Sequence, residues 1–254
     1  MVYMGSKARL AKYIIPILND LIKKNNIEIF IDGFVGGGNI VANPNYNIEC
    51  RIKYGFDNNK YLIALLNYVK NEDFKYIVVD KGEYSKVNKN KDNYEDWYVG
   101  YVGFILGNNG KWFNGYTRDF CDKNKSRHYS YERFNNLLRQ KEKLKEVTLF
   151  EQDFFNIKLD KIKPNTLIYL DPPYQNTTEY KKGSNIEDYN KFWDLVRELS
   201  KKCIVVVSEY TATEDFISIY EHYPQKMSLD SKRGKNGKVN IEKLWVVKNH
   251  FWKD

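Results

Sequence analysis

The apolar residues near the start of the chain follow two different spacings. Between Leu10 and Leu21 they recur three or four positions apart, so they share one face of a first predicted helix. Pro16 should bend this helix or mark its true start. Residues 27–32 (IEIFID) form a short apolar run, which predicts a buried strand that leads into a glycine loop, Gly33–Gly38.

The alternation of strand and helix continues further along the chain. A second strand ends at Tyr54–Asp57, and residues 61–69 (YLIALLNYV) follow it as a helix. Residues 166–170 (TLIYL) and 203–207 (CIVVV) are continuous apolar runs, as expected for central parallel strands covered on both faces. Residues 188–200 between them have helical spacing. The pattern predicts an α/β fold with a doubly wound, mostly parallel, Rossmann-like sheet.

Residues 71–145 break this rhythm. They hold two tryptophans, many tyrosines and repeated glycine and asparagine, with a basic stretch at residues 123–133. Residues 131–145 look helical and are strongly charged. A structureless loop of this length is uncommon in a compact domain, so we predict a small lobe inserted between two strands. The expected organisation is one domain made of residues 1–70 and 146–254, with the lobe at 71–145.

Charge favours a polyanionic partner. The 254 residues include 41 Lys and Arg against 33 Asp and Glu, a formal net charge of +8. Cationic side chains bind phosphates and release their counterions, although lysines that only solvate the surface would give the same total. Aromatic residues make up 16% of the chain, and bases stack on such rings. No apolar run approaches the roughly 20 residues of a membrane helix, so we expect no membrane association.

Cysteines and histidines indicate neither disulfides nor a metal site. The three cysteines are odd in number and far apart, and neither they nor the three histidines have metal-ligand spacing. The first residues lack the apolar stretch of a secretion signal because Lys7, Arg9 and Lys12 interrupt them. We expect a protein of the cytoplasm, in a bacterial or phage-infected cell, without a metal cofactor.

The sharpest chemical motif is Asp171-Pro172-Pro173-Tyr174, directly after the strand at 166–170. Ligands of doubly wound sheets gather at the carboxyl ends of strands. The carboxylate of Asp171 and a proline carbonyl can each accept one hydrogen of a planar –NH2 group, whose ring can stack on Tyr174. An amine held in this way can aim its nitrogen lone pair at an electrophilic methyl group. The alternative is a turn that ends the strand and has no chemical function.

The glycine loop indicates a ligand without a pyrophosphate. Glycine lets the backbone approach a ligand closely. Val41, however, stands where a dinucleotide-binding loop needs its third glycine, and no Gly-Lys-Ser/Thr follows to make a phosphate loop. A nucleoside remains, with Asp57 at the end of the next strand placed to accept ribose hydroxyls. The alternative for Asp57 is a cap on the helix that begins near Asn58.

Taken in order, the glycine loop, the acidic strand end and the DPPY motif resemble the Dam-type adenine-specific DNA methyltransferases, the phage-borne members in particular. Residues 3–7 (YMGSK) resemble the family's N-terminal motif, residues 153–155 (DFF) its cofactor-adenine motif, and residues 208–210 (SEY) a stretch after a later strand. The insertion lies where the family carries its target-recognition domain. The resemblance covers nearly the whole chain. It implies methyl transfer from S-adenosylmethionine to the 6-amino group of adenine in double-stranded DNA.

The same resemblance implies the roles of individual residues. Asp171 and Pro172 would hold the target amine, and Tyr174 would stack on the flipped base. The residues implied to contact S-adenosylmethionine, without a metal ion, are Tyr3, Lys7, Phe34, Gly36, Asp57, Asp153, Phe154 and Asp171. The alternative for Lys7 is a solvated side chain that opens a helix. In the lobe, the candidates for reading bases or holding phosphates are Lys111, Asn114, Arg118, Lys123, Lys125 and Arg127.

Two other functions remain open at this point. An amine methyltransferase acting on RNA or protein would share the glycine loop and a D/N-P-P-Y/F motif, but it typically lacks the N-terminal motif and the long insertion. A catalytically silent DNA-binding protein on the same scaffold would be favoured by changes at Asp171 or Tyr174, and both are present here.

Overall fold

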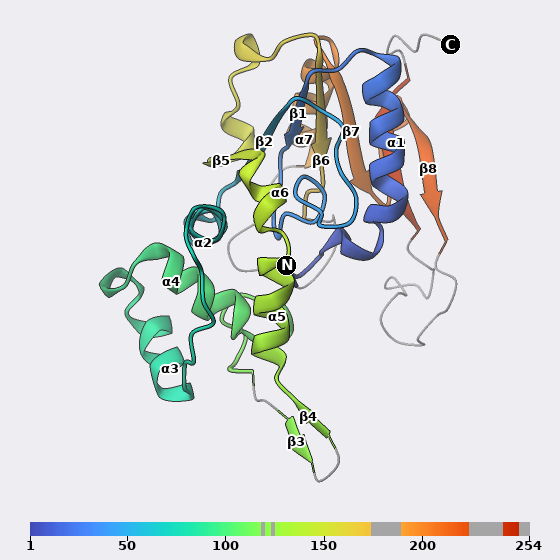
Figure 1. Ribbon diagram of the computed structural model, residues 1–254. Helices are drawn as coiled ribbons and strands as arrows, with labels where there is room; N and C mark the ends of the chain where they lie inside the picture. Colours follow the sequence, from blue (N-terminus) through green and yellow to red (C-terminus); the bar gives the residue numbers. More distant parts are fainter. Residues whose placement is uncertain (118–119, 123–124, 174–188, 224–240, 249–254) are drawn as a thin grey trace.

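The computed structural model describes residues 1–117, 120–122, 125–173, 189–223 and 241–248, apart from the side chains of 120–122 and 125–127. A seven-stranded sheet forms its upper part in Figure 1. In spatial order its strands are β5 (Val147–Glu151), β2 (Ile52–Asp57), β1 (Ile29–Asp32), β6 (Thr166–Leu170), β7 (Ile204–Glu209), β9 (Glu242–Val247) and β8 (Phe216–His222).

The strand order reverses between β1 and β6. The chain runs outward from β1 through β2 to β5, then crosses back to β6 and runs outward on the other side. The strands from β5 to β7 are parallel, whereas β9 is antiparallel to both β7 and β8. Ligands of such sheets bind at the carboxyl ends of the strands that flank the reversal. The predicted doubly wound, mostly parallel sheet is confirmed.

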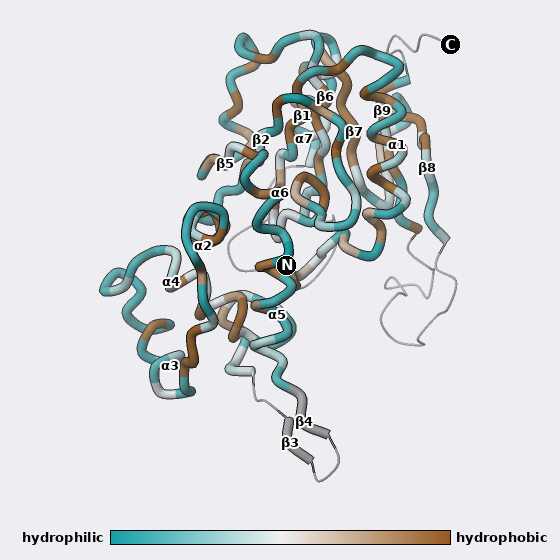
Figure 2. The backbone as a smooth tube through the Cα atoms, in the orientation of Figure 1, coloured by the Kyte–Doolittle hydropathy of each residue, from teal (hydrophilic) through white to brown (hydrophobic). Residues whose placement is uncertain are grey.

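Helices cover both faces of the sheet, and alternate strand residues point into two apolar cores. The helix α1 (Ala11–Lys24) packs on one face, in a cluster that contains Leu167 and Val206. The helix α7 (Tyr189–Ser200) packs on the other, in a cluster that contains Ile168. Figure 2 shows hydrophobic residues concentrated along the central strands, where both faces are covered.

The segment between β2 and β5 is mainly helical. Its helices are α2 (Lys60–Asn71), α3 (Lys81–Lys89), α4 (Asp96–Gly100), a π-helix (Tyr101–Ile105), α5 (Tyr129–Leu138) and α6 (Lys141–Lys145). Short 3-10 turns lie at Lys7–Arg9, Lys91–Asn93, Asn108–Gly110, Phe154–Asn156 and Leu159–Lys161. The hairpin of β3 (Phe120–Asp122) and β4 (Lys125–Arg127) projects from the lobe on the side away from the sheet (Figure 1). Within the described ranges, no helix is long and apolar enough to cross a membrane.

Aromatic side chains form the centre of the lobe. Phe74 packs edge-on against Trp97, Tyr101 and Phe134, with ring centroids 5.2 to 6.0 Å apart. Phe74, Tyr101 and Phe134 belong to the same apolar cluster as Leu167 of the sheet. The core of the sheet therefore continues into the lobe.

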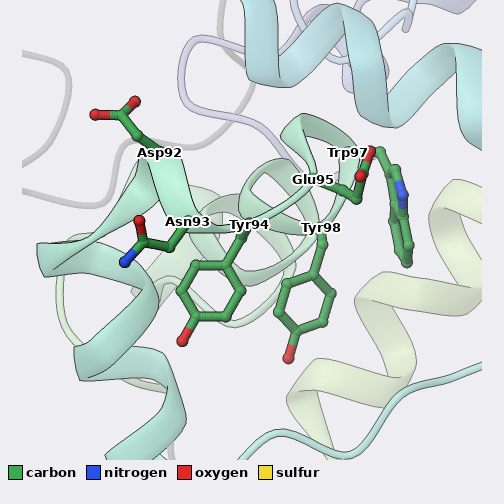
Figure 3. A pocket seen from close by; sticks show the side chains of 6 residues that line it. All are labelled: Asp92, Asn93, Tyr94, Glu95, Trp97 and Tyr98. Carbon is green, nitrogen blue, oxygen red and sulfur yellow. The ribbon is translucent and has the colours of Figure 1, made fainter.

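An open hollow on the lobe is lined by aromatic rings and carboxylates (Figure 3). Tyr94 and Tyr98 stack there with ring centroids 5.9 Å apart, and the ring of Trp97 lies edge-on to Tyr98. Asp92 and Glu95 also line the hollow, together with Asn93. The two carboxylates repel anions, so this face of the lobe does not suit a phosphate backbone.

The observed bounds of helices and strands agree best with the predicted ones where the apolar residues follow a single spacing. β6 spans the predicted residues 166–170. α1 begins at Ala11 and runs through Pro16, so the proline does not mark its start. The helical character predicted for residues 131–145 is confirmed, in two helices. α5 and α6 are separate helices there, and Gln140 between them is fully buried, with its amide group bonded away from both helices.

Gly100 and Gly82 both lie in helices, but only Gly100 faces the backbone of a neighbouring helix. A Cβ atom at Gly100 would lie 2.2 Å from the carbonyl oxygen of Tyr61 in α2, and a backbone atom cannot rotate away. We therefore expect Gly100→Ala to lower the free energy of unfolding by about 1–3 kcal/mol, as measured by urea denaturation. Gly82→Ala is the control, because its Cβ meets only the side chain of Asp80, at 3.1 Å. Equal effects of the two changes would contradict this packing of α2 against α4.

Candidate active site

Two aspartates lie at the carboxyl edge of the sheet, on either side of the reversal in strand order. Asp32 ends β1, and Asp171 directly follows β6. The register of the two strands pairs Asp32 with Tyr169, two residues before Asp171. This is the position at which doubly wound sheets bind their ligands, so the sheet itself brings the two carboxyl groups to a site.

Lys7 joins Asp171 to a third carboxyl group. Its side chain is only 4% exposed, and its Nζ donates to Oδ1 of Asp171 at 2.6 Å. The same Nζ lies 3.7 Å from Oε1 of Glu242, the first residue of β9. The hydroxyl of Ser208 in β7 donates to that Oε1 at 2.6 Å. One buried cation thus lies between two carboxylates, and the alternative of a solvated Lys7 is wrong.

Burial and charge oppose each other in this cluster. Burial raises the pKa of Asp171 to about 6, while the ammonium of Lys7 opposes the rise and the carboxylate of Glu242 adds to it. Burial alone would lower the pKa of Lys7, but the carboxylates of Asp171 and Glu242 raise it above its ordinary value. At neutral pH, Lys7 is therefore charged and Asp171 is mostly ionised.

Asp32 holds its proton at neutral pH. Burial raises the pKa of Asp32 to about 8, with the nearby carboxylate of Asp171 adding to the rise and the backbone N–H groups of Phe34 and Val41 opposing it. Its Oδ1 atom is buried without a hydrogen-bond partner. A buried polar atom left unbonded costs free energy. This group therefore leaves a hydrogen-bonding position at the site for a ligand to satisfy.

A hydrogen bond joins the glycine loop to the end of β2. The N–H of Gly36, which has φ +46°, donates to Oδ2 of Asp57 at 3.1 Å, and the N–H of Asn59 donates to Oδ1 at 2.9 Å. Burial raises the pKa of Asp57 to about 6, and these N–H groups limit the rise. The N-cap of α2 is Asn59, whose side chain accepts from the N–H of Leu62. The alternative of Asp57 as the helix cap is therefore wrong.

Two phenylalanines form an apolar wall beside the glycine loop. The rings of Phe34 and Phe154 lie 5.5 Å apart, and Phe154 is buried. Gly33 allows the wall to close, because a Cβ atom there would lie 2.8 Å from the ring of Phe154. Asp153 is exposed, and its carboxylate accepts from the N–H of Phe155, which fixes the short turn that carries Phe154.

The glycine loop is held from outside the sheet as well. Tyr3 packs on the loop, since a Cβ atom at Gly36 would lie 3.1 Å from its ring. The same ring lies 5.5 Å from that of Phe104 in the lobe. Gln140, between α5 and α6, donates from Nε2 to two carbonyl oxygens of the loop at 3.0 and 3.1 Å. The loop is thus wedged between the N-terminal segment and the base of the lobe.

Pro172 is buried and follows Asp171 directly, as the motif requires. The carbonyl of Pro173 accepts a hydrogen bond from the hydroxyl of Tyr189, at the start of α7, so this helix anchors the motif. Tyr174 lies outside the described residues.

The predicted DNA-binding residues lie in the lobe. Lys111 follows the 3-10 turn Asn108–Gly110, and Asn114 is exposed nearby. Lys125 and Arg127 belong to β4 of the projecting hairpin (Figure 1). Arg118 and Lys123 lie outside the described residues.

Sequence reasoning missed two parts of the site. The sequence analysis treated Asp32 only as the last residue of a strand. A carboxyl group between a buried strand and a glycine loop could, however, have marked it as a candidate site residue. Glu242 gave no signal, because it meets Ser208 only through the pairing of β9 with β7, 34 residues away along the chain. In the part of the chain with described placement, no group of three or more His, Cys, Asp or Glu side chains could hold a metal ion.

The pKa of Asp32 predicts a pH dependence of stability. Between the ordinary value of 3.8 and the folded value of about 8, the folded chain holds a proton that the unfolded chain has lost. Stability therefore falls as pH rises through this window, by an amount on the order of a few kcal/mol. Asp32→Asn is neutral at every pH and should flatten the decline, measured by urea denaturation from pH 4 to pH 8. Asp20→Asn, an exposed change on α1, is the control. A decline that stays as steep in Asp32→Asn would show that this group does not cause it.

Comparison with known proteins identifies a family and two relatives. The family model described as D12 class N6 adenine-specific DNA methyltransferase matches residues 3–234. The type II methyltransferase M.FokI of Planomicrobium okeanokoites is 24% identical over 76% of this chain and 32% of its own length. The modification methylase StsI of Streptococcus sanguinis is 29% identical over 74% of this chain and 30% of its own. This chain thus spans about a third of the length of these relatives.

Among solved structures, an rRNA methylase from Streptococcus thermophilus superposes with a TM-score of 0.36 and 8% identity, over 93% of each chain. The family match is far more specific, since it runs from Tyr3 through the glycine loop and the DPPY motif and ends at residue 234. The chain belongs to the D12 class N6 adenine-specific DNA methyltransferase family.

Proposed function

We propose that this protein transfers a methyl group from S-adenosylmethionine to the 6-amino group of a flipped-out adenine in double-stranded DNA. The observation that carries the proposal is the placement of Asp171. It is a mostly ionised carboxylate at the reversal of the strand order, next to the strand end to which the glycine loop bonds through Gly33. Family membership supports the same reaction.

The residues present fit S-adenosylmethionine. The buried, unbonded Oδ1 of Asp32 suits a polar group of its methionine part. Asp57, already bonded to the loop through Gly36, suits its ribose hydroxyls. Phe34 and Phe154 offer an apolar wall for its adenine. When bound, S-adenosylmethionine supplies an electrophilic methyl group.

The chain's own residues hold and orient the target amine. Ionised Asp171 accepts one hydrogen of the amine, and the carbonyl of Pro172 accepts the other. The Pro173 carbonyl is already bonded to Tyr189, which favours Pro172 for this role. Held in this way, the nitrogen keeps its lone pair out of the ring plane and aimed at the methyl group. After transfer, the nitrogen carries a positive charge and gives a proton to the carboxylate of Asp171 to which it is bonded, so no separate base is needed to start the reaction.

The target base must leave the duplex to reach Asp171. A paired adenine uses its amino group in a Watson–Crick hydrogen bond, and flipping it out costs about a few kcal/mol. Stacking on an aromatic side chain returns about 1–3 kcal/mol. We assign this stacking to Tyr174, which follows the amine-binding residues in the sequence.

We also propose that residues 71–145 recognise DNA through the side of the lobe that carries the β3–β4 hairpin. Lys125 and Arg127 lie on that hairpin, whereas the hollow of Figure 3 is lined by Asp92 and Glu95. Phosphates favour the first surface and avoid the second. The protein would then act on DNA in the cytoplasm.

Asp171→Asn tests the chemistry. The amide keeps the volume of the carboxylate but cannot carry its charge, so we expect the single-turnover methylation rate to fall about a hundredfold or more. Circular dichroism would show that the fold survives. Asp194→Asn, an exposed change on α7, is the matched control and should leave the rate unchanged. A rate near that of the unchanged protein would contradict the role of Asp171.

The same assay tests the substrate. Labelled S-adenosylmethionine is offered with duplex DNA, tRNA or protein, and the label should enter only the DNA, on adenine. Label in tRNA or protein would favour an amine methyltransferase of another class. Absence of label in all three, with retained DNA binding, would favour a silent DNA-binding protein.

Removing charge from the hairpin tests the lobe. We expect Lys123→Gln, Lys125→Gln and Arg127→Gln together to weaken binding to all DNA sequences. Each lost phosphate contact should flatten the slope of log Kd against log salt by about 0.9. S-adenosylmethionine affinity should stay the same, because Asp32 and Asp57 lie in the sheet. Lys23→Gln with Lys24→Gln on α1 is the control. Lost cofactor binding with unchanged DNA affinity would show that the lobe has another role.

A further inference from the structure

We propose that Glu242 is a positioning residue that draws Lys7 away from Asp171 when the target amine arrives. The inference rests on the proposed function and adds to it a second partner for Lys7. Glu242 lies outside residues 3–234, the part of the chain that the family model matches. The reason for assigning it a role is therefore its geometry alone.

Lys7 competes with the target amine for the carboxylate of Asp171. Its Nζ lies 2.6 Å from Oδ1 of Asp171, the distance of a charge-assisted hydrogen bond. An ammonium N–H and an amine N–H are donors of the same kind, and both would share the one negative charge of this carboxylate. The carboxylate is therefore a stronger acceptor for the amine when Lys7 withdraws from it.

Lys7 cannot withdraw into water or into an apolar site. Its side chain is 4% exposed, and an ammonium left unpaired in such a place costs several kcal/mol. A second carboxylate oxygen, Oε1 of Glu242, lies 3.7 Å from the same Nζ. A movement of about 1 Å would bring Lys7 to ordinary ion-pair distance of it. Lys7 therefore exchanges one carboxylate for another without losing its charge.

The structure holds Glu242 ready for this exchange. Its Oε1 accepts from the hydroxyl of Ser208 at 2.6 Å, and Ser208 is fully buried in β7. β9, which Glu242 begins, pairs with β7 through Ser208 and Leu244. The carboxylate is thus fixed by two strands, whereas Lys7 is attached to a short 3-10 turn. In the exchange that we propose, the lysine is the partner that moves.

Other titratable groups around the pair come from every neighbouring strand. Asp32 lies at the end of β1, Tyr169 in β6 and Tyr210 just after β7. Asp32 is protonated at neutral pH and both tyrosines are neutral, because burial raises the pKa of each. Lys7 therefore remains charged in this cluster, while Asp171, whose pKa is about 6, loses its charge as the pH falls through that value.

Glu242→Gln tests the proposal, because glutamine can still accept from Ser208 but has no charge to attract Lys7. Two quantities are measured on duplexes: the single-turnover rate as a function of pH, and the equilibrium binding affinity. First, the acid limb of the rate profile should move to lower pH, since Asp171 ionises more readily without a second carboxylate beside it. Second, the preference for binding a duplex with adenine over one with purine, which lacks the amino group, should fall about tenfold.

Three further variants make the result specific. Glu221→Gln removes a carboxylate from the neighbouring strand β8, where it pairs with Lys243, and should change neither readout. Glu242→Asp keeps the charge and should restore most of the preference for adenine. Ser208→Ala loosens Glu242 and should shift both readouts in the same direction by less, so the proposal stays testable if Glu242→Gln folds poorly.

The outcomes separate this proposal from the function on which it rests. An unchanged acid limb together with an unchanged preference for adenine, in a protein that methylates adenine duplexes, would overturn the role of Glu242 alone. A protein that methylates no adenine duplex would overturn the proposed function, and this inference with it.

Discussion

The ammonium group of Lys7 lies buried among acidic side chains at the carboxyl edge of the sheet, and the charge state of that edge depends on it. Asp171 keeps its charge there because the ammonium opposes the effect of burial. Removing one partner from such a buried pair leaves an uncompensated charge, at a cost of about 3–5 kcal/mol. The charge of Asp171 at the end of β6 therefore depends on the placement of Lys7 in the N-terminal segment.

The frame of the fold follows from local patterns. β6 and the neighbouring helix α7 are recoverable from sequence because a strand buried on both faces and a helix with one apolar face leave distinct spacings. The strand that each strand pairs with cannot be recovered in this way. The pairing of β9 with β7 joins residues more than thirty positions apart, and no spacing within either strand encodes it. The break between α5 and α6 was missed for a related reason, since Gln140 bonds to a loop about a hundred residues earlier.

The site divides in the same way. Asp57 and Asp171 were predictable because parallel strands bring their carboxyl ends to one edge, so any acidic strand end is a candidate. Lys7 was predictable only from resemblance, since nothing in the spacing of residues 3–7 shows that its side chain is buried. The contact of Glu242 with Lys7 and the unbonded oxygen of Asp32 could be found only from the three-dimensional structure.

The amide of Gln140 has a consequence for how this protein can change its target. It ties the base of the lobe to the glycine loop, so replacing the whole insertion would also remove a support of that loop. If the lobe recognises DNA as we propose, a new recognition sequence is gained at less cost by single substitutions in the lobe than by exchange of the whole insertion, because Gln140 is then retained.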